Sequence, residues 1–335
     1  MRRAGFLLAV LSATLVGGPG PAPAEPIYGL TTDNRIFSFD SASPNSISAL
    51  RPVTGLPAGT TLVGIDFRPA DPGLLVGVGQ NGSGGGAVFT IDRFTGAATQ
   101  INTIPTLTGT AFGVDFNPVP GALRIVSNAD QNLRITAGGA GVVNTDGTLN
   151  PGDPNIVGAA YSNNVPGGAG GQTTLYDIDS ALDRLFTQGT VNFPPGVSPN
   201  TGTLSTIGDL GVDTNELVGF DISGGSGVAF ASLTPAGAEG SSLYVIDLLT
   251  GGATLVGAID GGLFVRDISV SNAVPLPGGL ALVAAGAVAL FTMTWAGRCA
   301  ARRPSRVTAA ARRILARSAC GRGCPGPHAP DGLGA

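Results

Sequence analysis

The sequence predicts an all-β fold, a β-propeller of five blades, and three observations carry that prediction. Residues 26–272 contain short runs of β-branched and aromatic residues that Gly, Pro and Asn separate, as strands and turns require. About four such runs make up each repeat of roughly 40–50 residues, which is typical of propeller blades. No amphipathic helical pattern interrupts them. One blade cannot bury both of its faces, so the blades must pack around a common axis.

One motif recurs five times and predicts the strand nearest the axis. It places an acidic residue after a small or apolar segment, and its copies are 62–67, 111–116, 156–161, 217–222 and 263–268. In this alignment Asp66, Asp115, Asp221 and Asp267 occupy one equivalent position, and Ala160 occupies the fifth. Equivalent positions of a closed propeller form a ring around the axis.

A second motif ends a strand with Asp and a turn, at Asp40, Asp92, Asp179 and Asp247. We expect these side chains to accept hydrogen bonds from turn N–H groups.

The two ends of the repeat region predict how the ring closes. The last inner strand, at 263–270, has no strands after it, and the first strands, at 27–31 and 35–40, have no inner strand before them. Joining them in one blade completes the fifth blade and hides two sheet edges. Six blades or an irregular β-sandwich are the alternatives.

Residues 1–24 have the pattern of a secretory signal peptide. Arg2 and Arg3 precede an apolar stretch at 4–16 that is short for a membrane span, and the motif Ala22-Pro23-Ala24 follows. We expect cleavage after Ala24 and therefore an exported repeat domain at 25–272. A short N-terminal anchor is the alternative.

Residues 273–303 predict a sorting signal with a transmembrane helix at 278–297. A Val-Pro-Leu-Pro segment at 274–277 precedes this uncharged run, and Arg298, Arg302 and Arg303 follow it. The order resembles the PEP-CTERM class of bacterial sorting signals in its Val-Pro-Leu-Pro variant. The resemblance implies an exosortase-type processing enzyme as partner and a transient or permanent inner-membrane anchor.

The basic, Pro/Gly-rich tail at 304–335 extends beyond the usual end of such a signal. Either a short helix at 307–318 or a non-native extension of the reading frame fits it.

The steps Asp66-Phe-Arg-Pro69 and Asp115-Phe-Asn-Pro118, with the stretch 123–134, resemble the bacterial domain-of-unknown-function 4394 family. The resemblance covers most of residues 26–270. It supports a propeller-like fold and implies no activity or catalytic residue.

Composition excludes several kinds of chemistry from the repeat domain. Residues 26–272 hold 8 Arg against 20 Asp and Glu, a formal charge of −12, which argues against nucleic-acid binding. All three Cys and the single histidine, His328, lie after residue 272, and the sequence has no Lys. These absences exclude a Ser-His-Asp triad, a thiolate metal site and a P-loop lysine. The G-x-G-x-x-G pattern at 77–82 predicts a hairpin loop, because no helix follows it.

Carboxylates are the remaining candidates for a site. The ring of Asp66, Asp115, Asp221 and Asp267 could form an anionic funnel for a cation, with Ca²⁺ as the candidate ion. Alternatively, each Asp binds backbone N–H groups and locks one blade to the next. Asp177 and Asp179 share one strand face, which favours a cation or a raised pKa.

These features predict an exported cell-envelope or extracellular propeller with a binding or assembly role. Its expected partner is an envelope polysaccharide or a surface protein, and no cofactor or catalytic residue is expected. The alternative is a carboxylate-only glycosidase or lyase acting on envelope polysaccharide, because two suitably spaced carboxyls suffice for glycoside hydrolysis. A purely structural matrix component is a third interpretation.

Overall fold

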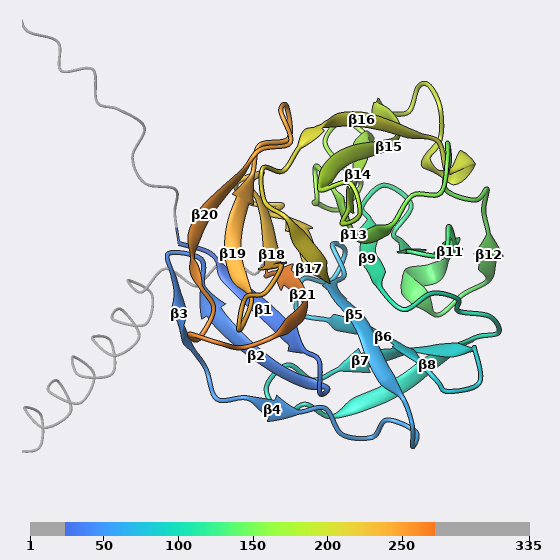
Figure 1. The fold of residues 1–335 in the computed structure, drawn as a ribbon. Coiled ribbons are helices and arrows are strands. Elements are labelled where there is room, and N and C mark those ends of the chain that lie inside the picture. Colours follow the sequence, from blue (N-terminus) through green and yellow to red (C-terminus); the bar gives the residue numbers. More distant parts are fainter. Residues whose placement is uncertain (1–23, 272–335) are drawn as a thin grey trace, which may run out of the picture. The chain divides into compact units, whose positions relative to one another are not determined.

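The computed structural model describes residues 24–271 and shows five antiparallel sheets arranged around one axis (Figure 1). This arrangement confirms the prediction of a five-bladed propeller with almost no helix. The proposed signal peptide, the sorting signal with its helix at 278–297 and the tail lie outside the described residues. Within 24–271 we find no helix long and apolar enough to cross a bilayer.

Four blades are each built from four consecutive strands. The first strand of each blade lies next to the axis, and the following strands lie progressively further out. The blades are β5 (Thr61–Phe67), β6 (Leu75–Gln80), β7 (Gly86–Ile91) and β8 (Ala98–Ile104); β9 (Phe112–Asn117), β10 (Ala122–Ser127), β11 (Asn132–Ile135) and β12 (Val143–Thr145); β13 (Ile156–Tyr161), β14 (Thr173–Asp179), β15 (Arg184–Phe193) and β16 (Leu204–Asp209); and β17 (Thr214–Ile222), β18 (Ala229–Pro235), β19 (Ser242–Ile246) and β20 (Ala253–Ala258). Two short 3₁₀ helices, η1 (Ala137–Gly139) and η2 (Pro199–Thr201), lie in connecting loops.

The fifth blade joins the two ends of the repeat region, as the sequence predicts. Its inner strand is β21 (Val265–Val270), which pairs with β1 (Pro26–Thr31); β2 (Arg35–Asp40) and β3 (Ser43–Ile47) follow, and β4 (Arg51–Pro52) also pairs with β2. Each inner strand contacts the inner strands of both neighbouring blades, so the ring β5–β9–β13–β17–β21 is closed.

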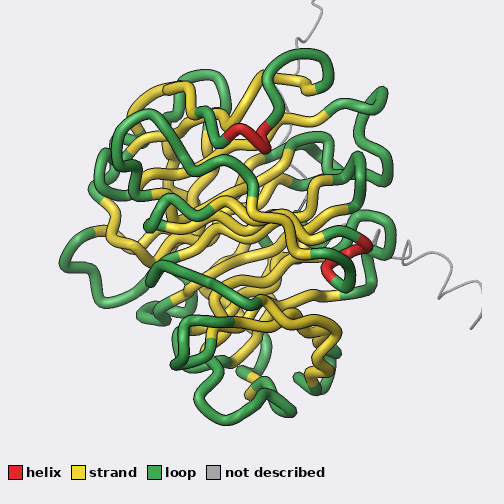
Figure 2. Tube along the Cα trace, turned by 90° about the vertical axis from the view of Figure 1, so that its right-hand side faces the viewer, coloured by secondary structure: helices red, strands yellow, loops and turns green. Residues whose placement is uncertain are grey.

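The core consists of five apolar clusters, one between each pair of neighbouring blades. The inner strands β9 and β13 are buried along their whole length because they pack against a blade on each side. The sequence of β13 accordingly is a continuous run of apolar and small residues, whereas β9 also buries Asp115 and Asn117. Loops gather at the ends of the strands, which cross the middle of the molecule (Figure 2).

Glycine in the inner strands permits close packing at the axis. A Cβ atom on Gly113 would lie 2.5 Å from the backbone nitrogen of Ala159, and one on Gly219 would lie 2.5 Å from that of Ile268. Both distances are far below van der Waals contact. A side chain at either position would therefore push two blades apart.

The structure also tests two predictions about turns. The sequence predicts a hairpin loop for the G-x-G-x-x-G pattern, but only its last two residues lie in the turn between β6 and β7, and the first four belong to β6; a strand and not a helix follows it, as expected. The second prediction is confirmed: each turn acid accepts hydrogen bonds from backbone N–H groups two or three positions later in the chain. The pairs are Asp40 with Ala42, Asp92 with Phe94 and Thr95, Asp179 with Ala181 and Leu182, and Asp247 with Leu249.

Candidate functional site

A ring of side chains links each inner strand to the next around the axis. The Oδ2 atom of Asp66 accepts the N–H of Phe116 at 2.8 Å, and Oδ2 of Asp115 accepts the N–H of Tyr161. In the same way, Oδ2 of Asp221 accepts the N–H of Val270 at 2.6 Å. Each carboxylate thus binds the N–H of the residue after the equivalent position in the next blade, which is the blade-locking arrangement.

Ser269, and not Asp267, completes this ring, which corrects the sequence alignment. The hydroxyl of Ser269 accepts the N–H of Phe67 at 3.0 Å, the same contact that each ring carboxylate makes with its neighbour. Asp267 accepts the N–H of Ile65 at 2.8 Å, two residues earlier. The repeat in β21 is therefore displaced by two residues, and Asp267 occupies the layer where the other blades carry glycine.

Ala160 leaves a gap at the remaining ring position. The N–H of Ile222 would face a side-chain acceptor there, but it donates instead to Oδ1 of Asp221, its own neighbour, at 2.6 Å. The backbone group at the gap is therefore satisfied without a fourth carboxylate.

The three ring carboxylates are buried close together, and this burial governs their protonation. One oxygen from each of Asp66, Asp115 and Asp221 lies within 4.8 Å of the others, and each residue is at most 2 % exposed. Burial, reinforced by the neighbouring acids, raises the pKa of Asp115 and of Asp221 well above its ordinary value, and burial also raises the pKa of Asp66. Either shared protons or a cation would relieve the repulsion.

Asp177 and Asp179, which share a face of β14, differ from the predicted acidic pair. Asp179 is fixed by the N–H groups of Asn155, Ala181 and Leu182. Asp177 is fully buried, and neither of its oxygens has a hydrogen-bond partner among residues 24–271. Burial raises the pKa of Asp177 to about 8, so desolvation and not repulsion by Asp179 is the cause.

The stretch 123–134 forms part of a buried polar network between two blades. The guanidinium of Arg124 is 1 % exposed and donates to Asn132 at 2.6 Å, Asp146 at 2.8 Å, Tyr161 at 3.2 Å and Asn200 at 2.6 Å. These partners come from two blades and satisfy the buried cation. Arg124 therefore has a structural role.

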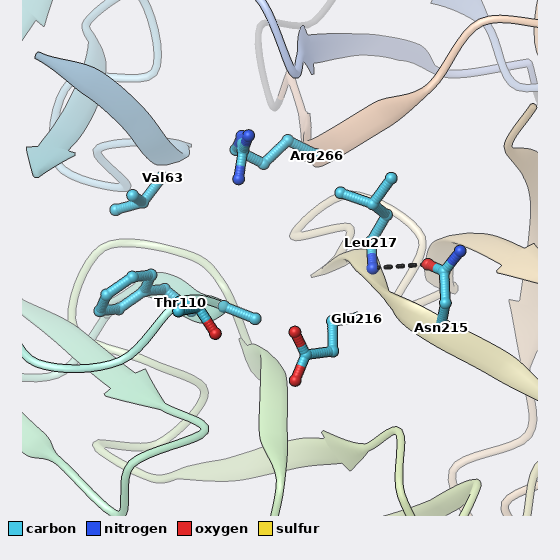
Figure 3. Close-up of a pocket in the computed structure, with 8 residues that line it drawn as sticks. Val63, Thr110, Asn215, Glu216, Leu217 and Arg266 are labelled. Atoms are coloured by element: carbon cyan, nitrogen blue, oxygen red, sulfur yellow. Dashed lines mark hydrogen bonds between the residues drawn. The ribbon is translucent and has the colours of Figure 1, made fainter. Parts of the chain in front are cut away.

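A pocket of about 310 Å³ opens at the end of the axis where the inner strands begin, and we call it the axial mouth. Four of the five inner strands, or the residues just before them, line it: Val63, Thr110, Ala111, Phe112, Asn215, Glu216, Leu217 and Arg266 (Figure 3). The axial mouth combines apolar walls with one cationic and one anionic side chain. Arg266 and Glu216 extend into it from different blades.

Arg266 and Glu216 differ in how they are held. The carboxylate of Glu216 accepts a hydrogen bond from the side-chain amide of Asn128 at 2.9 Å. Arg266 is half-buried, its Nε atom has no hydrogen-bond partner, and its Nη2 reaches the carbonyl oxygen of Thr32 only at 3.5 Å. Burial lowers the pKa of Arg266. The axial mouth therefore contains a cation that forms no ion pair with any of the described residues.

Two other hollows lack this feature. A pocket of about 280 Å³ between β9 and β15 includes Arg134, but two hydrogen bonds to Asp146 already neutralise that side chain. A hollow of about 530 Å³ at the rim of one blade is lined by uncharged residues, among them Thr60, Asn81 and Gln100. The axial mouth is thus the strongest candidate site of the three.

Sequence reasoning missed both charged residues of the axial mouth. With the corrected register, Arg266 is equivalent to Val63, Phe112, Val157 and Val218, so it is the one charged residue among apolar equivalents. That substitution is visible in the sequence once the repeat is aligned on Ser269. Glu216 lies just before its inner-strand motif, where no repeat pattern marks it.

The closed ring of five blades, with a sealed acidic interior and an open mouth at one end, defines a β-propeller. The chain belongs to the family described as Domain of unknown function (DUF4394), whose model matches residues 35–269. No curated protein matches the sequence.

Among solved structures, the chain is similar to a protein from Lactobacillus plantarum, with 12% identity over 74% of this chain and 99% of the other, and a TM-score of 0.39. It is also similar to TolB from Acinetobacter baumannii, with 11% identity over 74% of this chain and 66% of TolB, and a TM-score of 0.43. A putative 6-phosphogluconolactonase from Bacteroides uniformis has 14% identity over 71% of this chain and 83% of the other, with a TM-score of 0.39.

Proposed function

We propose that this chain is an exported binding protein whose ligand enters the axial mouth. One observation carries the proposal: Arg266 forms no ion pair with any residue of 24–271, and it lies in an open pocket on the propeller axis. Removing a cation from water without a partner is costly, so such an arrangement favours an anionic ligand.

Binding is favoured over hydrolysis because the axis carboxylates are inaccessible. A carboxylate-only glycosidase needs two carboxyl groups roughly 5–9 Å apart on either side of the substrate bond. Asp66, Asp115, Asp221 and Asp267 are 2 %, 1 %, 2 % and 3 % exposed, and backbone N–H groups bind all four. Glu216 is the one carboxylate that lines the axial mouth.

The proposed location rests on the two ends of the sequence. Cleavage after Ala24 would make Glu25 the first residue of the exported protein, in the periplasm, at the cell surface or outside the cell. The segment at 273–303 would bring the chain to the inner membrane and to an exosortase-type enzyme. An envelope polysaccharide or surface protein would then be the natural source of the ligand.

A binding array run beside a hydrolysis assay on the same polysaccharides tests the proposal. The variant Leu217→Trp fills the axial mouth, and Leu255→Trp, on the exposed outer strand β20, is its matched control. We expect binding that Leu217→Trp abolishes and Leu255→Trp preserves, without product formation. Binding that Leu217→Trp leaves unchanged, or turnover that Glu216→Gln abolishes, would overturn the proposal.

A further inference from the structure

We propose that the axial mouth recognises a small carboxylate that also carries hydrogen-bond donors, with Arg266 binding the carboxylate and Glu216 accepting from the donors. This inference rests on the proposed function and names the chemical class of its ligand.

Arg266 is the element that requires an anion. Four other arginines of residues 24–271, Arg35, Arg124, Arg134 and Arg184, each have a carboxylate within 4.0 Å. Arg266 has no such partner within the described part of the chain. Arg51, Arg68 and Arg93 also form no ion pair there, but of these four Arg266 is the one that lines the axial mouth. Its sequence neighbour Asp267 is occupied by the N–H groups of Ile65 and Ile268, at 2.8 and 2.9 Å. The guanidinium fork therefore remains available to a ligand.

A monoanion fits this site better than a dianion. A guanidinium matches a carboxylate with two parallel hydrogen bonds, which adds geometric specificity to the charge interaction. Glu216 lines the same pocket with the opposite charge, so Arg266 and Glu216 together are neutral. A phosphate dianion would be attracted by the charge of Arg266 but repelled by the charge of Glu216. For a carboxylate with one negative charge both interactions are half as large, but the occupied pocket then has a net charge of −1 instead of −2, which costs less to remove from water.

Glu216 is positioned to accept hydrogen bonds from the rest of the ligand. The amide nitrogen of Asn128 donates to Glu216 Oε1 at 2.9 Å, while the amide oxygen of Asn128 accepts the N–H of Thr110 at 2.9 Å. Asn128 thus ties Glu216, from one blade, to the wall of the mouth formed by another. A carboxylate held in this way is a prepared acceptor for a hydroxyl or ammonium group.

The size of the axial mouth limits the ligand to a small molecule or the end of a chain. Its volume of about 310 Å³ lies at the lower end of the range for small-molecule pockets. Apolar surface from Val63, Phe112 and Leu217 completes the wall. An acidic sugar supplies the donors as hydroxyl groups, and an amino acid supplies them as an ammonium group.

Isothermal titration of the purified protein distinguishes these sources and tests the class. The probes are sodium D-glucuronate, sodium D-galacturonate and L-alanine, with glucuronamide and glucose as uncharged counterparts. We expect binding of the sugar acids or of alanine, and roughly 10-fold to 100-fold weaker binding by Arg266→Gln, from the loss of a charged hydrogen-bond pair. Arg266→Lys should lose less affinity because the charge remains. Arg184→Gln, in an exposed ion pair of another blade, controls for net charge.

The outcomes separate this inference from the proposed function. No binding of any carboxylate probe, or equal affinity in the wild type and Arg266→Gln, would overturn the inference. If the array instead yields neutral ligands that Leu217→Trp excludes, the carboxylate class fails while the axial mouth stands as the binding site. If Leu217→Trp excludes nothing, the proposed function itself fails.

Discussion

The hydroxyl of Ser269 donates a hydrogen bond to the carboxylate of Asp66 at 2.7 Å, although 203 positions separate the two residues in the chain. The same hydroxyl accepts the backbone N–H of Phe67. A single serine therefore connects the last strand of the propeller to the blade that follows it around the ring. The one hydroxyl among the acceptor side chains of the ring thus lies in the blade that joins the two ends of the repeat region.

Ser269→Ala should weaken this closure. The substitution leaves the N–H of Phe67 buried without an acceptor and removes the donor to Asp66, at an expected cost of about 1–3 kcal/mol in the free energy of unfolding. Urea denaturation at neutral pH measures the cost, with the exposed Ser205→Ala as control. Equal midpoints for both variants would show that the closing contact contributes nothing.

The ring carboxylates should make the protein more stable as the pH falls from 8 towards 5. Their pKa values are raised in the folded state, so the unfolded chain ionises first and stability is lost as the pH rises towards the folded values. Asp115→Asn keeps an oxygen acceptor for the N–H of Tyr161 and removes one ionisation, so it should flatten this dependence. Melting temperatures across this pH range give the comparison.

The same variant separates shared protons from a bound cation. Because each Oδ2 of the three ring carboxylates already accepts a backbone N–H, we expect proton sharing and a melting temperature that neither Ca²⁺ nor a chelator changes. A Ca²⁺-dependent increase that Asp115→Asn abolishes would instead establish the cation site predicted for this ring.

Asp177→Asn should stabilise the protein at pH 8 relative to the wild type. The pKa of Asp177 is about 8 in the folded state because of burial, against about 4 in an unfolded chain. The wild type therefore loses stability between these pH values, by on the order of 5 kcal/mol at the upper end. Urea denaturation from pH 4 to pH 9 should show curves of wild type and variant that separate as pH rises. Parallel curves would mean that the pKa of Asp177 is the same in the folded protein as in the unfolded chain.

Glu25→Ala should destabilise the propeller at the seam between two blades. The Glu25 carboxylate accepts hydrogen bonds from the hydroxyls of Ser223 and Ser226, and its backbone N–H donates to Ser41 at 2.9 Å. Because Glu25 is only half-buried, we expect a loss of about 1–2 kcal/mol in the free energy of unfolding. Glu239→Ala, at an exposed position, is the matched control. An equal loss of stability in both variants would contradict a stabilising role of the Glu25 hydrogen bonds between the two blades.

Strand patterns and chain ends were sufficient to predict the five blades and the closing blade. Runs of β-branched residues and turn residues define strands and turns through local preferences. Pairing the first strand with the last one removes two exposed sheet edges, which predicts the closing blade. The ring register was predicted for Asp66, Asp115 and Asp221 because a glycine precedes each of them by two residues. It failed in β21, where Asp267 itself takes the glycine position and Ser269 takes the acid position.

The axial mouth could not be predicted because its residues come from four blades and share no motif. Arg266 became distinctive only after hydrogen bonds corrected the alignment, and Glu216 depends on Asn128 from another blade. The unpartnered state of Asp177 is also a property of packing, since the strand pattern of β14 shows only that it shares a face with Asp179. The surroundings of Arg266, Glu216 and Asp177 all depend on tertiary contacts, which cannot be predicted from sequence spacing.

A crystal structure of the protein grown with the tightest ligand from the binding array tests the central claim most directly. The account predicts an intact ligand in the axial mouth, in contact with Arg266 and Glu216, with the ring of Asp66, Asp115, Asp221 and Ser269 unchanged beneath it. A ligand seated elsewhere, such as the pocket beside Arg134, or a cleaved product at the axis would contradict it.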